Sequence, residues 1–251
     1  MNTTQSPHDP KTLHVTRLRE QLQRSQAFHA DVEGMERELG ILRRWQSRRL
    51  ANTHADLLQS PRYQPAADFF LNELYGDRDF RQREQELARV MPMMARILPE
   101  AMLHTAALAL ELNTLSHELD ARMTHILLEE FGLDERLDED RYIAAYRRCA
   151  HYELRGHQIN LVERLGRDLR TTVPKRFIHT ALKLARTPAR LAGLEALHHF
   201  LEAGFHAFRH MGADAETFVT VVTRRERAIL ERIRAGHPRP LCLNDDGARE
   251  R

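Results

Sequence analysis

The spacing of apolar residues constrains the fold of this chain more than any other feature. Along nearly all of its 251 residues they recur at intervals of three and four, and no useful length alternates as a strand does. Only 11 Gly and 10 Pro interrupt the pattern. The sequence therefore predicts an all-α protein, built as an irregular multi-helix bundle.

The longest predicted seam lies in the N-terminal region. From residue 12 to about residue 52 the spacing predicts a long amphipathic helix, with apolar positions at Val15, Leu18, Leu22, Phe28, Val32, Met35, Leu39 and Leu42. A narrow seam of this kind can pair with another helix. We expect it to be buried in the bundle or to support a homo-oligomer.

The central core helix is predicted at residues 99–131, whose early part is apolar nearly all round. Another long helix is expected at 138–172. Prolines then divide the chain, because Pro174 can open a helix to Arg186 and Pro188 a further helix to Met211. A last helix is predicted at 213–235.

Composition places the chain among soluble globular proteins, with 42% apolar and 29% charged residues. No apolar run approaches the roughly 18 residues of a membrane span, and the first residues lack the apolar core of a secretion signal. Cys149 and Cys242 are far apart and predict neither a disulfide framework nor a zinc site. We expect a cytoplasmic protein with one helical domain, 12–235, between a mobile N-terminus, 1–11, and a polar, mobile tail, 236–251.

Charge is segregated along the chain. Residues 164–190 contain eight basic residues and one acidic residue, although the net charge of the whole chain is only +2. Segregated charge of this kind predicts a surface that meets an anionic partner. The candidate binding residues are Arg170, Lys175, Arg176, Lys183, Arg186 and Arg190. An arginine excess also follows from codon usage in a GC-rich genome, so both interpretations stay open.

The helix after Pro174 should be basic and amphipathic. Its apolar side chains are expected to pack inward: Phe177, Ile178, Ala181, Leu182, Leu184 and Ala185. Among anionic partners we place an acidic protein first and a membrane surface second. Nucleic acid comes third, because a single aromatic residue in the basic stretch is too few for base stacking.

The segment Asp68–Gly76, DFFLNELYG, is followed by Asp79 and Phe80. It resembles the FFLxxLYG signature of an uncharacterised bacterial family of all-helical proteins, and similar sequence continues through residues 196–212. The resemblance covers most of residues 65–235. It implies a helical fold and brings no known activity.

Four aromatic or aliphatic side chains of this segment form a bulky wedge on a short helix: Phe69, Phe70, Leu74 and Tyr75. Aromatic residues at helical spacing usually contribute buried area, so we expect the wedge in the core. An aromatic anchor for a partner is the alternative.

A polar pocket is the main alternative site. On the predicted helix 138–172, Arg147, His151 and Gln158 project within the apolar arc, where polar groups must be hydrogen-bonded or paired. Arg147 could hold an anionic group and His151 could act as an acid, a base or a hydrogen-bond partner. A network between helices would explain the same three residues.

Carboxylate and histidine residues four apart can build di-iron sites in helical bundles. The chain has four such pairs, a weak excess over the roughly two expected by chance: Glu100 with His104, Glu153 with His157, Glu195 with His199, and Glu202 with His206. We expect no metal site.

No phosphate loop, dinucleotide fingerprint or nucleophile signature occurs in the sequence. We therefore expect a protein that acts by binding, without intrinsic catalysis or cofactor, and whose basic face meets an anionic partner. The alternative is a helical-bundle enzyme or small-ligand binder that uses Arg147, His151 and Gln158. A carboxylate/histidine metal oxidase is the third and least favoured hypothesis.

Overall fold

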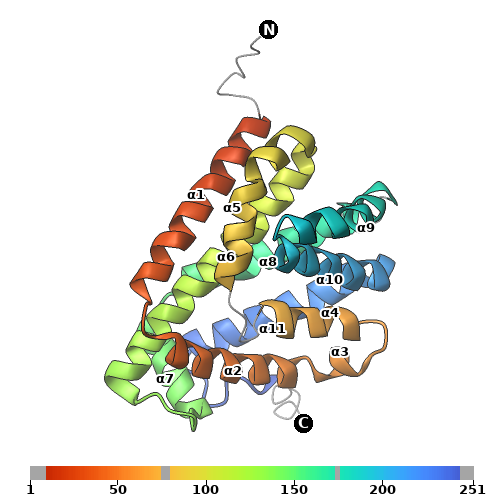
Figure 1. Ribbon diagram of the computed structural model, residues 1–251. Coiled ribbons are helices and arrows are strands. Elements are labelled where there is room, and N and C mark those ends of the chain that lie inside the picture. Colours follow the sequence, from red (N-terminus) through yellow and green to blue (C-terminus); the bar gives the residue numbers. More distant parts are fainter. Residues whose placement is uncertain (1–9, 75–79, 173–175, 244–251) are drawn as a thin grey trace.

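The computed structural model describes residues 10–74, 80–172 and 176–243. Within these ranges the chain forms eleven α-helices and no strand, which confirms the all-α prediction (Figure 1). The helices are α1 (Pro10–Asp31), α2 (Glu36–Thr53), α3 (Ala55–Gln59), α4 (Gln64–Phe69), α5 (Phe80–Ile97), α6 (Glu100–Ile126), α7 (Glu139–Cys149), α8 (Tyr152–Thr172), α9 (Arg176–Leu191), α10 (Glu195–Met211) and α11 (Ala215–Arg234). None of the described helices is long and apolar enough to cross a membrane.

The central helix is α6, which packs against α1, α2, α7 and α8. Its apolar start gives it a buried surface on several sides, with Leu103, Ala107 and Leu108 inaccessible or nearly so. A π-helical turn, Leu127–Phe131, prolongs it to Gly132. The sequence pattern therefore placed the core helix correctly, because a helix that is apolar all round can only be stable in the interior.

The long N-terminal helix is present as α1, but it ends earlier than predicted. Gly34 adopts φ +88°, in the left-handed region, and the chain turns there before α2 begins. Most of the predicted seam is buried within the bundle, at Leu18, Leu22, Phe28, Val32, Leu39 and Leu42. A homo-oligomer through this region stays a prediction.

Two later boundaries also differ from the sequence prediction. The expected helix 138–172 is divided at Ala150, whose φ of +51° ends α7 in the left-handed region before α8 begins. Pro188 does not open a helix, because it lies inside α9, and the turn at Gly193 precedes α10 instead.

The predicted tail begins as packed chain. Pro240 is buried, and Nη2 of Arg147 donates a hydrogen bond of 2.9 Å to the carbonyl oxygen of His237. The rest of the tail, 244–251, and most of the predicted mobile N-terminus lie outside the described residues.

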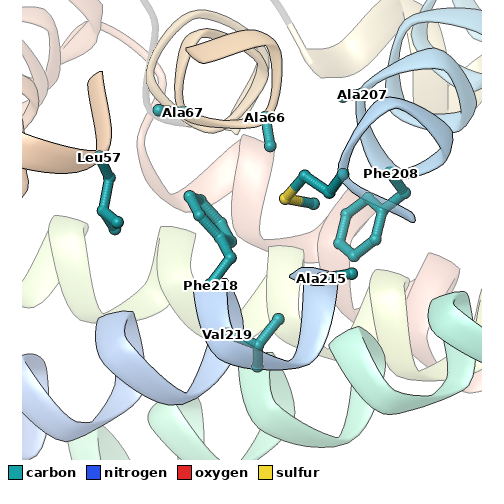
Figure 2. Packing of buried hydrophobic residues seen from close by; sticks show 9 residues of the cluster. Leu57, Ala66, Ala67, Ala207, Phe208, Ala215, Phe218 and Val219 are labelled. Carbon is teal, nitrogen blue, oxygen red and sulfur yellow. The ribbon is translucent and has the colours of Figure 1, made fainter. Parts of the chain in front are cut away.

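One core cluster joins α4, α10 and α11. Figure 2 shows Phe218 extending from α11 toward the helix that carries Ala66 and Ala67. Phe69 and Phe70 of the predicted wedge are partly buried against this cluster, and the Phe70 ring centre lies 5.8 Å from that of Phe218. The side chains of Leu74 and Tyr75 lie outside the described residues.

Helices α8 and α11 approach each other closely at Gly166. A Cβ atom at this position would lie 2.5 Å from Cγ2 of Val219, closer than real side-chain carbons approach. The missing side chain thus allows the two helix backbones to pack together.

Candidate functional site

The predicted basic surface lies mainly on α9. Three of the six candidate residues are exposed there, Lys183, Arg186 and Arg190. Lys175 and the side chain of Arg176 lie outside the described residues. Because α9 contains no Asp or Glu, this helix carries only positive charge.

The sixth candidate, Arg170, is exposed near the end of α8. Its Nη1 donates a hydrogen bond of 2.8 Å to Oε2 of Glu216 on α11. Part of its charge is therefore already compensated within the chain.

The described apolar side chains of α9 are only partly covered, and those of Phe177 and Ala181 lie outside the described residues. Ile178 is buried and Leu182 is half-buried, but Leu184 and Leu191 are 72% and 80% exposed. The prediction that Leu184 and Ala185 pack inward is therefore wrong. At 100° per residue, Leu184 lies about 120° around the helix from Ile178. The helix that mainly packs against α9 is α10 (Figure 1), so the side of α9 that carries Leu184 stays uncovered.

Helix α5 holds the turn between α9 and α10. Nη2 of Arg89 donates to the carbonyl oxygen of Gly193 at 2.6 Å. Glu86, which is 1% exposed, accepts a hydrogen bond of 2.7 Å from the backbone N–H of Leu197 in the first turn of α10. A carboxylate at this position also interacts favourably with the helix dipole. Helix α10 in turn contacts α9, because Nε2 of His198 on α10 donates to the carbonyl oxygen of Leu182 on α9 at 2.8 Å.

A second basic and apolar face lies on α5. Arg89, Met93, Arg96 and Ile97 share one side of the helix by their spacing. Met93 and Ile97 are 54% and 66% exposed, whereas the two acids of α5 are buried, Glu86 among them. The charged side chains that α5 and α9 expose are therefore all basic, and both helices line the same cavity. Sequence reasoning missed the α5 face, although the spacing of these four residues would have indicated it.

The cavity has a volume of about 810 Å³, within the range of roughly 300–1,000 Å³ typical of small-molecule sites. Side chains of every described α-helix except α1 line it, and most of them are apolar. Of the three predicted pocket residues only Gln158 lines this cavity. The break at Ala150 explains the result, because it places Arg147 and Gln158 on different helices.

Arg147 instead binds the end of α11. Its Nε donates to the carbonyl oxygen of Ile233 at 3.1 Å, beside its bond to His237. A positive charge at a helix C-terminus interacts favourably with the helix dipole. Gln158 donates from Nε2 to Oγ of Ser116 at 2.7 Å, which links α8 to α6.

His151 lies in the turn between α7 and α8, with Nε2 3.4 Å from Nη1 of Arg122. Burial lowers the pKa of His151, and the nearby charges of Arg122 and Arg155 lower it further. The neutral imidazole can therefore accept a hydrogen bond from Arg122. The structure does not bring Arg147, His151 and Gln158 together around one space.

The predicted carboxylate and histidine pairs are spread over several surfaces. Nε2 of His157 lies 3.0 Å from Oε1 of Glu111 on α6. Among the described residues, no three His, Cys, Asp or Glu side chains are close enough together to hold a metal ion. Cys149 and Cys242 are free thiols.

A mostly buried ion pair joins α2 to α11 at the cavity, with 14% of the Arg49 side chain and 18% of the Glu226 side chain exposed. Nη1 of Arg49 lies 2.6 Å from both carboxylate oxygens of Glu226, and Nε2 of His54 lies 3.2 Å from Oε1. Burial would raise the pKa of Glu226, but Arg49 and His54 outweigh burial and lower it to about 2. No local sequence pattern indicates this group, because Glu226 is more than 170 residues from both Arg49 and His54.

A family model matches residues 25–240, which include the wedge, the basic helix and the cavity-lining helices. The chain belongs to the DUF8198 family. DUF8198 is a domain of unknown function, so the uncharacterised helical family expected from the resemblance is confirmed and no activity comes with it. Comparisons with curated proteins and with solved structures give no match.

Proposed function

We propose that this protein acts by binding an anionic bilayer surface through α9 and the exposed face of α5, without intrinsic catalysis. One observation carries the proposal: both helices expose large apolar side chains next to basic ones and expose no acid. The apolar members are Met93, Ile97, Leu184 and Leu191, with exposed fractions of about one half to four fifths. This combination is typical of helices that lie in the interface of a bilayer.

The exposed leucines favour a bilayer over the acidic protein that the sequence placed first among the partners. A surface that meets only an acidic protein needs positive charge, whereas Leu184 and Leu191 gain free energy when an apolar layer covers them. Each Lys or Arg near an anionic surface adds about 1 kcal/mol of attraction. Nucleic acid stays third, because base stacking needs several aromatic residues and the basic stretch 164–190 contains only Phe177.

A cytoplasmic location belongs to the same proposal, since the cytoplasmic leaflet is the anionic one. The catalytic alternative has no support in the geometry, because Arg147, His151 and Gln158 do not surround one space.

We expect the protein to sediment with vesicles that contain anionic lipid and to stay in solution with vesicles of phosphatidylcholine alone. Reversing the charge at Lys183, Arg186 and Arg190 to Glu should lower the anionic-vesicle affinity at least tenfold, because three attractions become repulsions. Replacing Leu184 and Leu191 with Ser should also lower it, by about tenfold, through the loss of apolar burial.

A matched control reverses three exposed arginines on α1 and α2, Arg19, Arg37 and Arg48, which changes the net charge by the same amount. This control should bind vesicles nearly as the wild type does. The proposal is wrong if the two triple variants bind equally. An acidic protein partner is supported instead if charge reversal abolishes a protein complex while the Leu184 and Leu191 variant keeps it.

A further inference from the structure

The cavity follows the length of α6. The residues of α6 that line it extend from Met102 to Asp120 and recur at three and four positions, on one side of the helix. At a rise of 1.5 Å per residue this stripe is about 27 Å long. The space is therefore elongated and suits a chain-like molecule better than a compact one.

One end of the cavity is apolar and reaches the surface. Met102, Ala106 and Ala109 line it from α6, and Met93 and Ile97 line it from α5. The last two are more than half exposed, so they lie at the opening. An apolar chain that enters there can replace water along this wall.

The other end is polar, and its carboxylates already have partners. Glu226 pairs with Arg49 and His54, as described above. Asp120 accepts a hydrogen bond of 3.1 Å from Nε2 of Gln46, and its Oδ2 lies 3.7 Å from Nε of Arg43.

Glu84, which also lines the cavity, accepts from Oγ of Ser25 at 2.7 Å and from Nδ2 of Asn113 at 2.9 Å. A charged ligand group would have to break one of these buried pairs, and a buried charge without a partner is costly. The polar end therefore disfavours both carboxylate and ammonium groups.

Buried polar atoms without a hydrogen-bond partner also occur at this end, and two of them bear on the ligand. They are Oε1 of Gln46 and Nδ1 of His54, and both side chains are more than nine-tenths buried. Nε2 of Gln46 donates to Asp120, so Oε1 is a hydrogen-bond acceptor. An unsatisfied acceptor such as Oε1 of Gln46 is matched by a ligand that donates a hydrogen bond.

We infer that the cavity binds an elongated, uncharged apolar molecule with a hydroxyl group at one end, of the class of long-chain alcohols. The hydroxyl lies at the polar end, where Gln46 accepts its hydrogen bond, and the chain extends along α6 toward Met93 and Ile97. This inference does not rest on bilayer binding, because the same molecule could enter from solution.

Three probes of matched chain length test the inference on the wild-type protein: 1-dodecanol, 1-methoxydodecane and dodecanoic acid. Each would displace N-phenyl-1-naphthylamine, an uncharged fluorescent reporter, at pH 7 and without vesicles. The alcohol should bind about three- to tenfold more tightly than the ether, the range expected for one neutral hydrogen bond. It should also bind more tightly than the acid, which is ionised at this pH.

The assignment of the cavity is tested by Ala109→Phe, which fills the space from α6. It should lower the affinity for alcohol and ether together, by at least tenfold. The matched control, Ala101→Phe, places the same ring on an exposed position of α6 that does not line the cavity and should change neither affinity. Gln46→Leu should remove the preference for the alcohol and keep the affinity for the ether.

Each contrary result would refute a particular part of the inference. Failure of all three probes to bind, or equal loss in both phenylalanine variants, refutes the cavity as a binding site. Tighter binding of the acid refutes an uncharged ligand, and equal binding of alcohol and ether refutes the hydroxyl. If Gln46→Leu does not fold, the three probes on the wild type still decide. Vesicle binding is measured separately, so failure of the proposed function and failure of this inference are distinguishable.

Discussion

Replacing Glu226 with Leu should lower the free energy of unfolding by about 3–5 kcal/mol, because it removes the carboxylate that balances the mostly buried guanidinium of Arg49. Both carboxylate oxygens of Glu226 lie 2.6 Å from Nη1 of Arg49, and little of either side chain is exposed. Urea denaturation measured by circular dichroism gives this quantity. The double variant with Arg49→Met should recover most of the loss, since the pair is then replaced by apolar groups.

The preceding residue of α11 forms an ion pair that provides a matched control. Arg225 pairs with Asp56 of α3 at 2.7 Å, but the Asp56 side chain is largely exposed. Asp56→Leu should therefore cost no more than about 1 kcal/mol. Equal losses for Asp56→Leu and Glu226→Leu would show that burial does not strengthen the inner pair.

The pH dependence of the free energy of unfolding provides a second test of the Glu226–Arg49 pair. The pKa of Glu226 is lowered from 4.5 to about 2 in the folded protein. A lowered pKa stabilises the fold above the unfolded-state value, and this contribution disappears as the pH falls from about 4.5 toward 2. The difference in stability between wild type and Glu226→Leu should therefore shrink over that interval. A difference that stays constant down to pH 2 would contradict the pairing.

Replacing Phe218 with Ala should cost about 3–5 kcal/mol, the loss expected for a large aromatic side chain removed from a core. Phe218 is buried, and its ring centre lies 5.8 Å from those of Tyr63 and Phe70. It therefore joins α11 to the segment that carries α4, as Figure 2 shows for its neighbours Ala66 and Ala67. The melting temperature and the urea midpoint measure the loss.

The control for this truncation is Leu13→Ala on α1, whose side chain is 63% exposed. It should change the free energy of unfolding by less than about 0.5 kcal/mol. A small loss at Phe218 would mean that the aromatic cluster around α4 is not part of the cooperative core.

The sequence predicted those features that depend on periodicity within one helix. The apolar start of α6 and the seam at Leu18, Leu22 and Leu42 were found this way, because burial follows directly from spacing. The helix break at Ala150 was not predictable, since alanine favours helix and rarely adopts a left-handed conformation. Because the sequence prediction missed this break, it placed Arg147, His151 and Gln158 on one helix and therefore around one pocket.

The sequence also did not predict the features that depend on which helices pack against one another. The exposure of Leu184 and Leu191 follows from the single main neighbour of α9. The cavity forms because small side chains such as Ala106 and Ala109 on α6 face other helices across a space that they do not fill. Neither the neighbours nor that space can be read from local spacing.

Bilayer contact through α9 is tested most directly by measuring how deeply the side chain at position 191 lies in the bilayer. Leu191→Trp in a Trp45→Phe background places the only tryptophan of the chain on the exposed apolar side of α9. Anionic vesicles with bromine on their lipid chains should quench its fluorescence strongly, whereas a Leu13→Trp control in the same background, on exposed α1, should stay bright. Equal quenching of the two tryptophans, or none at position 191 while the protein sediments with the vesicles, would contradict bilayer binding through α9.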